Sequence, residues 1–130
     1  MTAFKESIDA ARIAAAGADE MKGADIVAFD VSETLGLTDI FLIATGSSPR
    51  HVLSIAEEVE KQMHLQLSMN PREREGVEEG QWVLLDFGDI VVHVMDQDSR
   101  DFYDLERLWS QCPRIDLQLP ERAEDIDDAE

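Results

Sequence analysis

The stretch from Trp82 to Trp109, WVLLDFGDIVVHVMDQDSRDFYDLERLW, decides the fold of this chain. Residues 82–87 and 90–95 form two apolar runs, and Gly88 and Asp89 join them. This pattern is typical of a β-hairpin with a two-residue turn, because glycine takes a positive φ without a Cβ clash. We therefore expect two antiparallel strands that pair directly with each other.

A helix is expected to follow the hairpin, from Ser99 to about Ser110. Asp98 and Ser99 can cap its N-terminus, since their side-chain oxygens accept hydrogen bonds from free N–H groups of the first turn. At about 100° per residue, four apolar side chains fall on one face of such a helix. We expect these residues to pack on the sheet: Phe102, Leu105, Leu108 and Trp109.

Tyr103 falls outside this apolar face, between Arg100 and Arg107. One interpretation is a surface tyrosine that lies over a neighbouring loop, because single exposed aromatic side chains are common. The other is an anchor for a partner protein, since Trp, Tyr and Arg are enriched among the residues that dominate interface energetics. The spacing alone leaves both interpretations open.

Upstream of this stretch, helical and strand-like spacing alternate. Apolar residues at helical intervals predict a first helix over residues 2–21. The continuous apolar run 40–44 predicts a strand covered on both faces. Ser48 and Pro49 indicate the start of a second long helix, as N-cap and first-turn residue. The remaining expectations are a strand at 25–31, a weak edge strand at 65–69 and a loop at 70–80.

This order of elements predicts an α/β fold, a single domain with a mixed β-sheet and helices packed on it. We expect the domain to span residues 1–115 and an acidic, disordered tail to span residues 116–130. The apolar runs are all much shorter than the roughly 20 residues that cross a membrane. The N-terminus has no signal-peptide core, and Cys112 is the single cysteine, so we expect a cytoplasmic protein.

The chain is strongly acidic. It carries 29 Asp and Glu against 11 Lys and Arg, a formal net charge of −18. Direct nucleic-acid binding is not expected, because neutralising phosphates requires clustered basic residues. The charge is consistent either with attraction to a basic partner or with solubility alone.

Two blocks of sequence carry a resemblance to the ribosomal silencing factor family, also called Iojap-like proteins. The resemblance covers about residues 3–115, and the chain departs from the family pattern at 33–36, at Phe87 and after Pro120. The matching residues are Trp82, Asp86-Phe87-Gly88-Asp89, Val92-His93-Val94, Ser99-Arg100, Phe102-Tyr103, Leu105-Glu106 and Leu108-Trp109, and upstream Asp25-Ile26-Val27, Asp30-Val31, Thr38-Asp39, Thr45-Gly46, Arg50-His51-Val52 and Ile55-Ala56.

The resemblance implies a nucleotidyltransferase-like fold and a translation repressor that is not an enzyme. Such a protein binds the fourteenth protein of the large ribosomal subunit, blocks the small subunit from joining, and has a further role in large-subunit biogenesis. By matching motif, the contact surface includes Trp82, Phe87, Tyr103 and Arg107. Trp82 and Phe87 have opposite parity on one strand, so the pattern leaves open which faces outward. A homodimer of the free protein is also left open.

The alternative is a divergent nucleotidyltransferase-like enzyme or nucleotide sensor that uses the turn around Gly46, since such a turn before a helix can hold an anion. Those enzymes need paired carboxylates on a neighbouring strand to hold Mg²⁺. No such pair follows Ser48, and Asp86 and Asp89 flank a turn. His51, His64, His93 and Cys112 form no metal or nucleophile motif. We therefore expect no catalytic residue, metal or cofactor.

Overall fold

The structure, a computed structural model, describes residues 3–120. Helices and strands alternate through the third helix, and then three consecutive strands are followed by two short helices. The elements are α1 (Lys5–Glu20), β1 (Ala24–Asp30), α2 (Ser32–Leu35), β2 (Ile40–Gly46), α3 (Pro49–Leu67), β3 (Glu73–Glu75), β4 (Trp82–Asp86), β5 (Ile90–Asp96), α4 (Gln97–Tyr103) and α5 (Leu105–Leu108).

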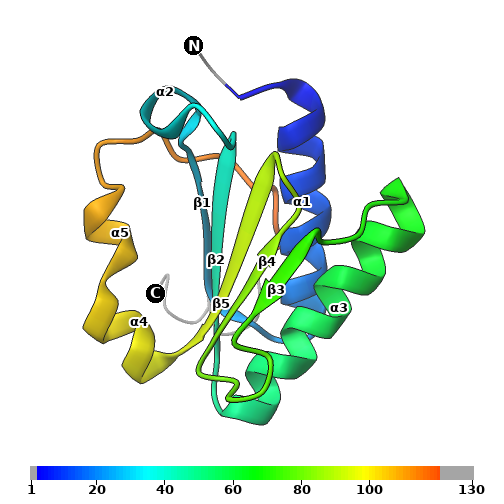
Figure 1. Cartoon of the computed structure of the whole chain (residues 1–130), viewed down its shortest axis with the longest axis vertical. Coiled ribbons are helices and arrows are strands. Elements are labelled where there is room, and N and C mark those ends of the chain that lie inside the picture. The colour runs from blue at the N-terminus through cyan, green and yellow to red at the C-terminus, as the bar shows by residue number, and fades with distance from the viewer. Residues whose placement is uncertain (1–2, 121–130) are drawn as a thin grey trace.

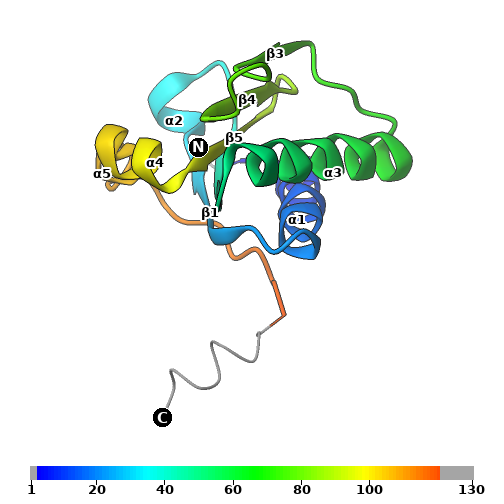
Figure 2. The same cartoon turned by 90° about the horizontal axis from the view of Figure 1, so that it is seen from below.

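In this part of the chain the strands form one five-stranded mixed sheet in the order β1-β2-β5-β4-β3. The central pair β2 and β5 is parallel, and every other neighbouring pair is antiparallel. Helices α1 and α3 cover one face, and the short helices α4 and α5 lie on the other (Figures 1 and 2). The predicted single α/β domain with a mixed sheet is confirmed.

The sheet therefore separates two hydrophobic cores. In β2, Leu42 belongs to the main core with α1 and α3, whereas Ile43 belongs to a smaller second core with Leu105 and Trp109. This explains why the strand reads as a continuous apolar run, since both of its faces are covered. Each fully buried Leu or Ile contributes about 2 kcal/mol to the free energy of folding.

The hairpin and the start of α3 follow the local signals of the sequence. The Phe87 N–H donates to the Ile90 carbonyl at 2.9 Å, and Gly88 has a φ of 93°. The Asp86 carboxylate accepts a hydrogen bond from the Gly88 N–H at 2.8 Å, which fixes the turn. At α3, the Ser48 hydroxyl accepts from the His51 N–H, with Pro49 in the first turn. Both predictions are confirmed.

The predicted edge strand at Leu65–Met69 is wrong. Helix α3 continues to Leu67, and the edge strand is Glu73–Glu75, inside the segment expected to be a loop. Its three residues are charged and exposed, so it has no alternating apolar pattern. The strand forms through backbone pairing with β4.

The single helix predicted from Ser99 to Ser110 is also wrong. Asp104 is left-handed, with φ 48° and ψ 53°, and divides the segment into α4 and α5. The side chain of Asp96 caps α4, in place of Asp98 or Ser99. A helical projection drawn through this break does not hold. Of the four side chains expected to pack on the sheet, Leu105 and Trp109 do so, whereas Phe102 and Leu108 are 80% and 69% exposed.

Residues 113–119 run past the outer edge of the sheet after α5. The Asp30 N–H donates to the Pro113 carbonyl at 2.8 Å, and the Ile115 N–H donates to the Ala28 carbonyl at 2.9 Å. Leu117 is buried in the main core. The structure thus places the first residues of the expected tail with the domain. The rest of that tail, residues 121–130, lies outside the described residues.

Candidate functional site

An aromatic surface lies where β4 meets α4. Trp82 on β4 contacts Tyr103 at the end of α4, with ring centroids 4.7 Å apart at 51°. The ring of Phe102 meets Tyr103 edge-on at 5.0 Å. Tyr103 is 53% exposed and Trp82 is half-buried. We call Trp82, Phe102 and Tyr103 the aromatic surface; side chains of this type dominate binding energy when a partner buries them.

A buried histidine, His93, fixes the position of the Trp82 side chain through a hydrogen bond. The indole Nε1–H of Trp82 donates to His93 Nδ1 at 3.1 Å, so the neutral ring carries its proton on Nε2. His93 is 4% exposed, and this burial lowers its pKa to about 4. Its ring contacts Phe41 at 4.9 Å, and Phe41 contacts Trp109 at 5.1 Å. A row of rings therefore connects Trp82 to the second core.

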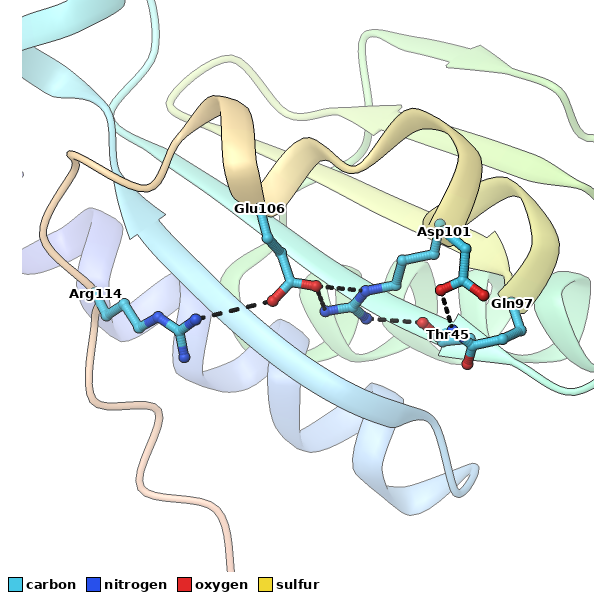
Figure 3. Close-up of polar contacts among 6 residues, drawn as sticks. Thr45, Gln97, Asp101, Glu106 and Arg114 are labelled. Carbon is cyan, nitrogen blue, oxygen red and sulfur yellow. Dashed lines mark hydrogen bonds and ion pairs between the residues drawn. The ribbon is translucent and has the colours of Figure 1, made fainter.

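An arginine network fixes α4 and α5 to the sheet (Figure 3). Arg100 on α4 is buried, and its Nη1 donates to the Thr45 hydroxyl of β2 at 2.7 Å. Its Nε and Nη2 lie 2.9 and 2.8 Å from Glu106 Oε1 on α5. Arg114 approaches the other oxygen of Glu106 at 3.8 Å. The network was missed because the sequence placed Arg100 on a solvent face; its only signal was its membership in the family block.

The structure brings together some of the predicted contact residues and separates others. Trp82 and Tyr103 touch, and Arg107 is exposed on α5. Phe87 is 8% exposed and belongs to the main core, on the opposite face of the sheet. Of the pair with opposite parity, Trp82 is therefore the side chain on the aromatic surface. Burial corrects the expectation of a contact through Phe87.

A groove of about 400 Å³ lies beside the aromatic surface. Trp82 and Tyr103 line it together with residues from β3 and from the loop before β4. The other lining residues are Glu75, Glu79, Gln81, Leu84 and Ser99.

The turn around Gly46 is occupied by contacts within the protein. The Ser47 N–H donates to His51 Nδ1 at 2.8 Å, and His51 Nε2 lies 2.7 Å from the Met21 carbonyl, which ties α3 to the end of α1. A Cβ on Gly46 would lie 2.8 Å from the backbone nitrogen of Val52. Gly46 is thus needed for close packing of β2 against α3.

Residues 3–120 contain no group of three His, Cys, Asp or Glu side chains placed to hold a metal ion.

Gly46→Ala is expected to lower the free energy of unfolding by about 2 kcal/mol, because the added methyl group meets backbone that cannot yield locally. Urea denaturation measures this change. Gly17→Ala in α1 is the matched control, since its Cβ would meet only contacts of 3.4 Å or more. Its stability should stay equal or rise by up to about 1 kcal/mol. Equal stability of both variants would contradict the packing role of Gly46.

The fold and the site define a small α/β domain that presents an aromatic surface on one short helix, α4, and the neighbouring strand β4. A family model described as "Ribosomal silencing factor during starvation" matches residues 4–130. A ribosomal silencing factor from Bacillus subtilis (strain 168) is 41% identical over 108 residues, 83% of this chain and 91% of that protein. The chain belongs to the ribosomal silencing factor family.

Other relatives agree with this assignment. A mouse protein named mitochondrial assembly of ribosomal large subunit protein 1 is 34% identical over 88 residues, 66% of this chain and 39% of that protein. A crystal structure of a Chromobacterium violaceum protein is 36% identical, covers 88% of this chain and 90% of its own, and superposes with a TM-score of 0.75.

Among residues 3–120, no helix is both long and apolar enough to span a membrane.

Proposed function

We propose that this chain binds the large ribosomal subunit in the cytoplasm through the fourteenth protein of that subunit and prevents the small subunit from joining. Membership in the family supports binding to the ribosome. The observation that carries the proposed contact surface is the aromatic surface, where Phe102 and Tyr103 stay exposed beside Trp82. The name of the mouse relative supports an additional role in large-subunit assembly.

Steric occlusion is the mechanism that fits this architecture. A domain with a radius of gyration of roughly 14 Å, seated on the face between the subunits, occupies space that the small subunit requires. This chain contributes a fixed docking surface: His93 orients Trp82, and the Arg100 network holds α4 against β2. The net charge of −18 favours rapid encounter with a basic ribosomal protein.

Co-sedimentation with purified ribosomal particles tests this function. The protein should pellet with large subunits and not with joined ribosomes, and excess protein should reduce subunit joining in a light-scattering assay. Binding should weaken as salt rises, because the attraction between an acidic domain and a basic partner is screened. Equal pelleting with joined ribosomes would contradict the occlusion mechanism.

Tyr103→Ala should weaken binding to the large subunit by about 2 kcal/mol, some thirtyfold, if Tyr103 anchors the partner. The free energy of unfolding should change by less than about 1 kcal/mol, since the side chain is 53% exposed. Sedimentation titrations and thermal melts measure the two effects.

The neighbouring aromatic residue Phe102 provides a comparison for the effect of Tyr103→Ala on stability. The sequence predicted that Phe102→Ala would mainly destabilise the fold, but its 80% exposure replaces that prediction with a change below about 1 kcal/mol. An exposed residue on another face, Leu65 of α3, is the control, and Leu65→Ala should leave binding unchanged. Parent-like ribosome binding by Tyr103→Ala would remove the aromatic surface from the proposed interface.

A further inference from the structure

Two carboxylates that form no ion pair within residues 3–120 line the groove beside the aromatic surface. Glu75 ends β3, Glu79 lies in the loop before β4, and both are exposed. Among the ion pairs of residues 3–120, neither glutamate takes part, whereas nearby Arg72 and Arg74 are engaged by other acidic side chains. The groove therefore presents negative charge that the other side chains of residues 3–120 leave without an ion-pair partner.

The same groove has aromatic walls. Trp82 and Tyr103 line it together, and the hydrogen bond to His93 fixes the indole. The face of an aromatic ring attracts a cation, and arginine favours such sites because its planar guanidinium stacks on rings. Carboxylates bind the edge of the same guanidinium through charge-assisted hydrogen bonds. Rings and carboxylates thus converge on one type of ligand.

We propose that this groove receives an arginine side chain of the partner, with its guanidinium against Trp82 and Tyr103 and its N–H groups toward Glu75 and Glu79. The identity of the partner as a ribosomal protein rests on the function proposed above; the preference for a cationic side chain rests on the groove alone. A volume of about 400 Å³ accommodates such a side chain. With this groove beside it, the aromatic surface would select a positively charged side chain in addition to making apolar contact.

A small-molecule titration of the full-length protein tests the groove without the ribosome. The probe is N-acetyl-arginine amide, and N-acetyl-citrulline amide is its uncharged isostere. The indole N–H resonance of Trp82 should shift saturably with the arginine probe and not with citrulline. The shift should disappear in the Glu75→Gln/Glu79→Gln variant. Equal shifts with both probes, or an unchanged titration in the variant, would overturn the proposal.

Large-subunit binding then tests whether the partner uses the groove. Glu75→Gln/Glu79→Gln should weaken co-sedimentation about tenfold, as expected when charge-assisted contacts are lost. Glu6→Gln/Glu57→Gln removes the same charge from α1 and α3 on the other side of the sheet, and should change binding less than about twofold, the effect of steering alone.

The outcomes separate the two proposals. If the parent fails to bind large subunits while the arginine probe still shifts Trp82, the proposed function fails and the cation site stands. If the parent binds and both double variants weaken binding equally, long-range charge explains the effect and the arginine site on the partner is refuted.

Discussion

Acidification from neutral pH to about pH 4 is expected to destabilise the parent by about 3 kcal/mol more than a His93→Gln variant. Burial lowers the pKa of His93 from 6.5 to about 4 in the folded protein. As the pH falls below 6.5, His93 becomes protonated in the unfolded chain but stays neutral in the folded protein. The stability present above pH 6.5 is therefore lost progressively as the pH falls toward 4.

Urea denaturation of both proteins at a series of pH values measures this difference. The carboxylates titrate in both proteins, so the difference between the two curves isolates the imidazole. Glutamine is uncharged throughout and retains an oxygen that can accept from Trp82 Nε1. Parallel curves for parent and variant would show that His93 accepts a proton in the folded state without cost.

Glu106→Ala is expected to lower the free energy of unfolding by about 3 kcal/mol, because it leaves the guanidinium of Arg100 buried without its anionic partner. The side chain of Arg100 is 6% exposed, whereas that of Glu106 is 35% exposed. The low end of the range for a broken buried pair applies, since water reaches the glutamate. Helices α4 and α5 should loosen together, and the aromatic surface with them.

Arg100→Met is the matched variant, and it should cost less, about 1 kcal/mol. It removes the buried charge, fills a similar volume, and leaves Glu106 a carboxylate that water can solvate. The main loss is the hydrogen bond to Thr45. Denaturation of both variants gives the comparison, and an Arg100→Met cost equal to or larger than that of Glu106→Ala would contradict this account of the network.

The elements that sequence predicted best have signals within a few residues of each other. Gly88 and Asp89 between two apolar runs define the hairpin, and Ser48 with Pro49 defines the start of α3. The charged strand at Glu73–Glu75 carries no such signal, because it is held by backbone pairing with β4 and by the ion pair between Arg74 and Glu60, both of which join residues distant in sequence. The break at Asp104 could not be predicted from the sequence either. A single aspartate in the left-handed conformation does not change the spacing of apolar residues.

The candidate site was predicted in part. Tyr103 was singled out because it departs from the expected apolar face, and the structure places it exposed beside Trp82 although that face was drawn wrongly. Parity showed that Trp82 and Phe87 point to opposite faces, but both faces are apolar, so only packing identifies Trp82 as the surface residue. Arg100 was missed because Thr45 is distant in sequence and the burial of both depends on tertiary structure.

The two edges of the sheet have a consequence for how other chains can attach. Residues 113–115 hydrogen-bond along β1, and at the opposite edge β3 offers only three charged residues. Covered, short and charged edges resist the addition of a foreign strand and the fibrillar stacking that follows from it. Addition of a partner strand by backbone hydrogen bonds is therefore disfavoured at both edges of the sheet. We expect a partner to bind through side chains on the faces of this domain.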